Sequence, residues 1–265
     1  MDRSFLSNDT LIKASQKFVC IRLATYEDKK ETAFLTKIYT GRSGELENTV
    51  FCLLTPDGKQ PLSRAGRSPN FSFHSPSNLA DEIVALSAKY PAKPVKANSS
   101  PVFPKIKNFR LGLNVASCDN LPCVVIIGKD KQEVEKTQAK LNEVIWSDEI
   151  AGRFVFCSTT KIDDLKDIQD AEGKTIQITA GILAIQPGTY GIDGTVLEAI
   201  KLDLDAKELG GKLISIAKAF EFKGKNHSQH VRSGNRQGIQ WETEVPVTDP
   251  DSIRAMERNQ ANRKR

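Results

Sequence analysis

Two cysteines lie close enough together in the sequence to act as a pair. Cys118 and Cys123 bracket the loop SCDNLPC, with four residues between them. A thiolate can attack a disulfide, and two neighbouring thiols can also close a small structural bridge. Redox motifs use the shorter spacing Cys-x-x-Cys, and Pro122 stiffens this loop. The pattern therefore favours a structural disulfide, with a redox-active pair as the alternative.

Two histidines offer a second kind of chemistry. His227 and His230 are three positions apart, a spacing that could place both imidazoles on one metal ion. Zinc usually takes four ligands from Cys or His side chains, and the sequence shows no third or fourth ligand nearby. His74 is the only other histidine. Metal handling is therefore an alternative hypothesis, and we expect no cofactor.

The remaining motifs do not indicate catalysis. Cys20, Cys52 and Cys157 each lie in an apolar run, which predicts buried thiols that pack as small hydrophobic groups. The glycine-containing loops at 41–44 and 188–191 match neither a phosphate-binding loop nor a dinucleotide fingerprint, so both are predicted to be turns. We therefore expect a protein that binds a protein partner and is not an enzyme.

The charge of the chain is concentrated near one end. The 265 residues carry a net charge of +5, and residues 223–265 hold nine Lys and Arg against five Asp and Glu. This segment lacks the interleaved aromatic and glycine residues of RNA-binding tails. We therefore expect a solvated basic tail and no nucleic-acid partner.

Composition also limits the cellular setting. No stretch approaches the roughly 20 apolar residues of a membrane span, so no membrane association is expected. The first residues lack the apolar segment of a secretory signal. The sequence is compatible with a cytoplasmic protein if Met1 is native, and with an exported one if the chain is a mature form with an added methionine.

The chain is predicted to be organised around residues 18–35. The apolar run FVCIRL at 18–23 predicts a buried strand, and the apolar spacing that follows predicts a helix from about Glu27 to Tyr39. A reactive group on the turn between them would lie over the positive end of the helix, where a thiolate is stabilised. This turn is therefore where the fold would place chemistry.

A predicted hairpin and two further helices complete the first half. Residues 49–62 predict two strands joined by the turn Pro56-Asp57-Gly58, because proline fixes φ and glycine accepts a positive φ. A helix at 10–16 can be capped by Asn8 or Ser7, and another helix is predicted at 79–89. Strands alternating with helices indicate a layered α/β domain.

This arrangement resembles the thioredoxin superfamily, in which a strand leads to redox cysteines at the start of a helix. The likeness is carried by Ala24-Thr25-Tyr26 and by residues 49–59. Glu27 and Lys30 stand at the places of the two cysteines, and Asn48 stands at the place of a cis-proline. The resemblance implies a frame without redox chemistry and a binding surface that includes Tyr26, Glu27, Lys30 and Asn48. A plainer interpretation of Glu27 and Lys30 is a charge that stabilises the helix start and a solvated lysine.

The second half is predicted to repeat this order of elements. Where the family has its cysteines and its cis-proline, the sequence has Gly128-Lys129-Asp130-Lys131 and Ala180-Gly181. The expected strands are 109–115, 123–127, 153–157, 176–185 and 194–200, and the expected helices are 131–146, 161–169 and 206–220, the last capped by Asp205.

The fold class predicted from the sequence is α/β, with two thioredoxin-like sandwich domains and an extended C-terminal tail. The domains are assigned to 1–90 and 108–222, the linker to 91–107 and the tail to 223–265, with a helix in its last fifteen residues. The function predicted is a redox-inactive module for protein binding or assembly. The alternatives are a thiol-disulfide oxidoreductase using Cys118 and Cys123, and a metal-handling protein using His227 and His230.

Overall fold

The computed structural model describes residues 5–91, 101–106, 108–220, 226–238 and 243–263. The chain is a mixed α/β protein that divides into two compact units. Unit 1 consists of Met1–Val95 together with Trp241–Arg265, and unit 2 consists of Lys96–Gln240. Unit 2 is thus inserted between two parts of the chain that fold together as unit 1.

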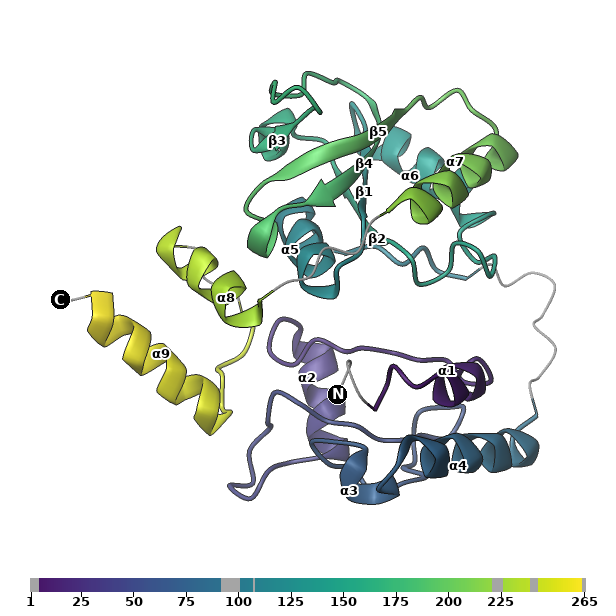
Figure 1. Ribbon diagram of the computed structural model, residues 1–265, viewed down its shortest axis with the longest axis vertical. Coiled ribbons are helices and arrows are strands. Elements are labelled where there is room, and N and C mark those ends of the chain that lie inside the picture. Colours follow the sequence, from purple (N-terminus) through teal and green to yellow (C-terminus); the bar gives the residue numbers. More distant parts are fainter. Residues whose placement is uncertain (1–4, 92–100, 107, 221–225, 239–242, 264–265) are drawn as a thin grey trace. The chain divides into compact units, whose positions relative to one another are not determined.

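Unit 2 is built on a mixed sheet with the strand order β2-β1-β4-β5-β3 (Figure 1). Strand β1 runs parallel to β2 and antiparallel to β4, β4 and β5 form an antiparallel pair, and β3 lies parallel to β5. The interior strand β1 is buried along its whole length, as expected for its continuous apolar sequence CVVII. The strands are β1 (Cys123–Ile127), β2 (Val155–Thr159), β3 (Ile168–Gln169), β4 (Gly181–Pro187) and β5 (Gly194–Ile200).

Helices cover both faces of this sheet. Val124 and Ile126 of β1 pack in the core shared with α6 (Lys131–Asn142) and α7 (Ala206–Ala219). Their neighbours Cys123, Val125 and Ile127 pack in the second core, which includes α5 (Phe109–Asp119). Because successive side chains of a strand point to opposite faces, one apolar strand serves both cores.

Polar side chains define where the helices of unit 2 begin. Asp205 caps α7 in a reciprocal capping box with Glu208, as the sequence predicted. The side chains of Asp130 and Asn108 accept hydrogen bonds from backbone N–H groups at the starts of α6 and α5, respectively. These caps satisfy N–H groups that have no partner inside the helix.

Two predictions for the second half were wrong. Residues 109–115 form helix α5 instead of a strand, because Phe109, Leu113 and Ala116 recur at helical spacing on its buried face. The predicted helix at 161–169 is reduced to the short 3₁₀ helix η1 (Ile162–Leu165), after which the chain enters β3. The strands at 123–127 and 194–200 and the helix starting at Ala206 are confirmed.

Unit 1 contains helices and irregular segments with two small cores. The first core packs α1 (Asp9–Ser15) against α4 (Pro76–Lys89) and includes Phe73 of the short helix α3 (Asn70–Phe73). The second core is centred on Tyr26, Leu35 and Leu46, of which Leu35 comes from α2 (Lys29–Ile38). Asn8 caps α1, as expected.

The predicted strands of unit 1 are absent from its described residues. Residues 18–23 are irregular, and Val19 and Ile21 are 89% and 61% exposed, so the apolar run does not form a buried strand. In the predicted hairpin the only pairings are single bridges from Phe51 to Gly66 and from Leu54 to Pro61. The turn itself is confirmed, since Gly58 has φ +69° and its N–H donates to the Thr55 carbonyl (2.8 Å).

The segment expected to be an extended tail contains two helices. Helix α8 (His227–Arg236) belongs to unit 2, and α9 (Pro250–Arg263) belongs to unit 1. The prediction of an extended arm was therefore wrong for these residues, whereas the helix in the last fifteen residues is confirmed. Trp241, a predicted contact of the arm, lies outside the described residues. Within the described ranges, no helix is both long and apolar enough to cross a membrane.

Candidate functional site

Tyr26, a predicted binding residue, is an anchor for a distant segment of the same unit. Its side chain is only 5% exposed. Its hydroxyl donates to the Leu46 carbonyl (2.9 Å) and accepts the backbone N–H of Asp249 (3.0 Å). Its carbonyl accepts the N–H groups of Glu244 (2.8 Å) and Val245 (3.2 Å). Three of these hydrogen bonds fasten residues 244–249 to Tyr26, and the fourth ties Tyr26 to Leu46.

Residues 244–249, the returning segment, also complete the second core of unit 1. Val245 and Val247 pack against the cluster of Tyr26, Leu35 and Leu46. This cluster has only three buried members, so two additional valines form a substantial part of its apolar surface. Of the residues predicted to bind a partner, Tyr26 is thus buried within the chain itself, whereas Lys30 and Asn48 are exposed.

A buried carboxylate lies at the end of this segment. Asp249 has an exposed fraction of 0% and caps α9 by accepting the backbone N–H of Ser252 (2.8 Å). Arg67 Nη2 lies 3.8 Å from Asp249 Oδ2, and Arg67 Nε lies 3.4 Å from Glu47 Oε2. Asn48, another predicted binding residue, donates from Nδ2 to Ser252 Oγ (3.0 Å).

Opposing influences act on the pKa of Asp249. Burial is the largest single influence and acts to raise it. Hydrogen bonds from the Ser252 backbone and hydroxyl and from the Asn48 backbone, with the charge of Arg67, outweigh burial and lower the pKa below its ordinary value. Asp249 is therefore charged at neutral pH, and a negative charge at a helix N-terminus is favourable.

Glu27 and Lys30 lie at the start of α2, as predicted, but the helix cap is Asp28. The Asp28 carboxylate accepts the backbone N–H groups of Lys30 (2.8 Å) and Glu31 (3.1 Å). Glu27 turns back, and its Oε2 accepts the N–H of Tyr26 (3.0 Å). These contacts agree with the plainer interpretation, in which the charges stabilise a helix start.

The cysteines do not form the predicted local pair. All five lie in the described ranges and are free thiols. Cys118 is on α5, where its Sγ lies 3.7 Å from Asn114 Oδ1. Cys123 is buried in β1, and its Sγ lies 3.5 Å from the Sγ of Cys157 on β2. The structure therefore places Cys123 beside a thiol that the sequence spacing did not suggest.

Burial distinguishes these thiols from one another. A hydrogen bond with Cys123, followed by burial, holds the pKa of Cys157 well above its ordinary value. A thiol with a raised pKa is a poor nucleophile at neutral pH. Cys157 is buried as predicted, whereas Cys52 is half-buried and Cys20 is exposed, because the run around Cys20 is not a buried strand.

His230 lies in a buried polar cluster of unit 2. Its Nε2 accepts the backbone N–H of Tyr190 and lies 2.8 Å from Ser117 Oγ. Ser117 Oγ in turn donates to the Gly188 carbonyl (2.6 Å).

This polar cluster fastens α8 to the loop between β4 and β5. The loop contains the short helix η2 (Thr189–Gly191), in which Tyr190 has φ +60°. The Tyr190 ring packs edge-on against His230 and leaves no room for a side chain at Gly234 of α8. A Ser–His pair can be nucleophilic, but Ser117 is buried here and its proton is directed to a carbonyl. The cluster is therefore suited to holding α8 in place.

Metal binding through the predicted histidines gains no support from the geometry. His227 is the first residue of α8, but its side chain lies outside the described part of the chain. Among the described residues, no three His, Cys, Asp or Glu side chains gather in a way that could hold a metal ion. Sequence reasoning missed the contacts of His230 because its partners Ser117 and Tyr190 are distant in the chain.

The carboxyl end of β1, where the resemblance places reactive thiols, carries no cysteine. Gly128 follows the strand, and Asp130 caps α6. A Cβ at Gly128 would lie 2.8 Å from Val134 Cγ2 and 3.0 Å from the Asp130 carbonyl oxygen, so the turn is closely packed. The Lys129 N–H donates to Glu133 Oε2 (2.8 Å). These groups can form a helix cap but cannot exchange a disulfide.

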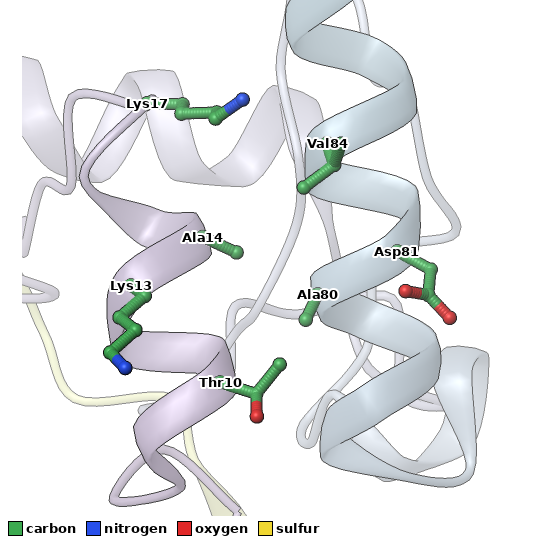
Figure 2. Close-up of a pocket in the computed structure, with 7 residues that line it drawn as sticks. All are labelled: Thr10, Lys13, Ala14, Lys17, Ala80, Asp81 and Val84. Atoms are coloured by element: carbon green, nitrogen blue, oxygen red, sulfur yellow. The ribbon is translucent and has the colours of Figure 1, made fainter.

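A shallow groove of about 270 Å³ lies between α1 and α4 of unit 1 (Figure 2). The helices approach closely because Ala14 and Ala80, both small, face each other across its floor. Lys13 and Lys17 line the α1 side and Asp81 lines the α4 side. The groove has no buried polar side chain among its lining residues, so it shows no specific ligand chemistry.

Comparison with known proteins identifies no relative. No protein-family model matches the chain, and neither a curated protein nor a solved structure is detectably similar to it.

Proposed function

We propose that the chain is a redox-inactive protein that binds a protein partner, with a thioredoxin-like sandwich in unit 2. The order of elements supports this: β1, α6 and β2 form a parallel pair joined by a helix, and an antiparallel hairpin and α7 follow. The resemblance implies strand, helix, strand, helix, hairpin and helix for the second half, and the second of these helices is reduced to η1 followed by β3. The thioredoxin-like sandwich is proposed for unit 2 alone. In the described residues of unit 1, the only strand-like pairing consists of isolated bridges.

One observation carries the proposal. The end of β1 presents Gly128, Lys129 and Asp130 where the family presents thiols, and the side chain of Asp130 caps a helix. Cys118 and Cys123 do not replace them, since Cys123 is fully buried beside Cys157. Disulfide exchange requires an accessible thiolate, so this scaffold is suited to binding without electron transfer.

Reduction of insulin disulfides in the presence of dithiothreitol tests the redox part of the proposal. We expect the rate with the full chain to equal the rate with dithiothreitol alone. Cys118→Ser and Cys123→Ala should leave this rate unchanged. Turnover by the wild-type chain that is abolished in Cys118→Ser would replace the proposal with a thiol-disulfide oxidoreductase.

A count of reactive thiols provides a second test. With an aromatic disulfide reagent under native conditions, the exposed Cys20 should react first. Cys123 and Cys157 should react only after denaturation, because both are fully buried. Mass spectrometry of the labelled peptides identifies the sites, and rapid labelling of Cys123 in the folded chain would contradict the structural basis of the proposal.

A further inference from the structure

The two outer edges of the unit 2 sheet differ in how they are covered. At β2, Lys105 pairs with Phe156, and the Ile106 N–H donates to the Phe156 carbonyl (2.8 Å). At β5, the short strand β3 pairs only with Gly194 and Thr195. No described residue pairs with the outer side of 196–200. Within the described residues, a single bridge and one hydrogen bond meet the β2 edge, and no residue pairs with the five residues 196–200 on their outer side.

An open edge presents backbone groups that require an extended partner. In an antiparallel pair, alternate residues direct N–H and C=O groups away from the neighbouring strand. Residues 196–200 pair with β4 on one side only, so some of these groups point away from the sheet. The β4–β5 pairing is interrupted by a bulge, since Ile185 pairs with Val196 and Ala184 with Glu198. Leu197 is the extra residue, and it is 44% exposed.

A groove of about 130 Å³ lies directly beside this edge. Leu197 and Glu198 form its β5 side, and Ile216 and Phe220 contribute apolar surface from the end of α7 and the residue after it. Added strands gain affinity from main-chain hydrogen bonds and specificity from pockets for alternate side chains. The groove and the open edge together meet both requirements.

We propose that this edge binds an extended segment of another protein, which adds a strand beside 196–200 and places one apolar side chain in the groove. The inference rests on the proposed binding function and assigns it a location. Because the occupant must offer backbone N–H and C=O groups in a row, it is a peptide segment and not a small molecule.

Charge determines which extended segment fits. A second copy paired antiparallel about the centre of this edge would place Glu198 opposite its own counterpart, and opposed like charges destabilise a sheet. The Glu198 carboxylate is already bound by Lys212 Nζ (2.6 Å), and the exposed Lys201 follows the strand directly. The local charge therefore favours a partner segment with an acidic residue near Lys201.

Selection of linear peptides from a random phage-displayed library against the full chain tests the proposal. We expect peptides with an apolar and an acidic residue. They should bind Leu197→Arg at least tenfold more weakly than wild type. Ile162→Arg is the matched control, because Ile162 is a similarly exposed residue of unit 2 (47%). This variant should bind the peptides as tightly as wild type does. Ser215→Trp, which fills the groove from α7, replaces Leu197→Arg if that variant does not fold.

Amide hydrogen exchange provides the second measurement. A bound peptide should slow exchange within residues 196–200, because it supplies their missing main-chain partners. Failure to recover peptides, or peptides that bind Leu197→Arg as tightly as wild type, would overturn the edge site. Peptides that bind another surface would also overturn the edge site, but the proposed binding function would stand. Reduction of insulin by the chain would overturn the proposed function whatever the peptide result.

Discussion

The two units of this chain are stabilised in different ways. Unit 2 has a continuous sheet between two large cores, one of which includes fourteen buried residues. Unit 1 has two smaller cores, and the one around Tyr26 has three buried residues and depends on a segment that follows unit 2 in the sequence. The comparison teaches that a discontinuous unit with little sheet structure relies on individual polar anchors, whereas the sheet unit relies on burial.

Removal of the returning segment should have the largest effect. A chain that ends after residue 240 loses Val245, Val247 and the hydrogen bonds of 244–249 to Tyr26. We expect unit 1 to lose its protection against amide hydrogen exchange while the sheet of unit 2 keeps its own. Unchanged protection around Tyr26 and Leu46 in the shortened chain would show that unit 1, like unit 2, is stable without residues 241–265.

The same substitution in each unit compares the two kinds of core. Leu213→Ala in unit 2 should lower the free energy of unfolding by about 3–5 kcal/mol, because the large rigid core cannot close around the cavity. Leu35→Ala in unit 1 should cost about 2 kcal/mol, since its small cluster can relax. Hydrogen exchange measured separately for each unit gives both values, and equal costs would argue against the distinction.

Loss of a single hydroxyl should also affect unit 1 measurably. Tyr26→Phe removes the donor to the Leu46 carbonyl and the acceptor of the Asp249 N–H. We expect a loss of about 1–3 kcal/mol in the free energy of unfolding of unit 1, because buried backbone groups lose a partner. Tyr39→Phe, at the half-buried end of α2, is the control and should cost less.

The smallest expected effect depends on pH. The pKa of Asp249 is lowered in the folded chain, so its stabilising effect is complete above the unfolded pKa of about 3.9 and is lost as pH falls through the folded pKa. Wild type should therefore exceed Asp249→Asn in stability at neutral pH, and the difference should shrink in acid below about pH 4. Asp251→Asn, at an exposed neighbouring position, is the control. A difference that is constant with pH would rule out this contribution.

Sequence reasoning succeeded where local signals and burial coincide. The apolar run of β1, the hairpin turn at Gly58 and the cap at Asp205 each depend on a few adjacent residues, and all were predicted. The run at 18–23 has the same apolar composition as a strand, but no neighbouring strand pairs with it in the described residues, so it stays exposed. A strand requires a partner that its own sequence does not specify.

The candidate sites were harder to predict for the same reason. Tyr26, Asn48 and His230 were selected from the sequence, but each has a partner far away in the chain. Asp249 lies 223 positions from Tyr26, Ser252 lies 204 positions from Asn48, and Ser117 lies 113 positions from His230. The partners Asp249 and Ser252 lie in a segment that composition describes only as basic and polar. Charge and spacing alone could not indicate that this segment closes over Tyr26.

The insertion of unit 2 also has a consequence for biosynthesis. A ribosome delivers residues in order, and domains generally fold as they emerge. The sheet of unit 2 can therefore form while Tyr26 still lacks the segment 244–249 that covers it. During that interval the nascent first portion of the chain exposes part of the core around Leu35 and Leu46, and this core is completed only after residues 244–249 have been translated.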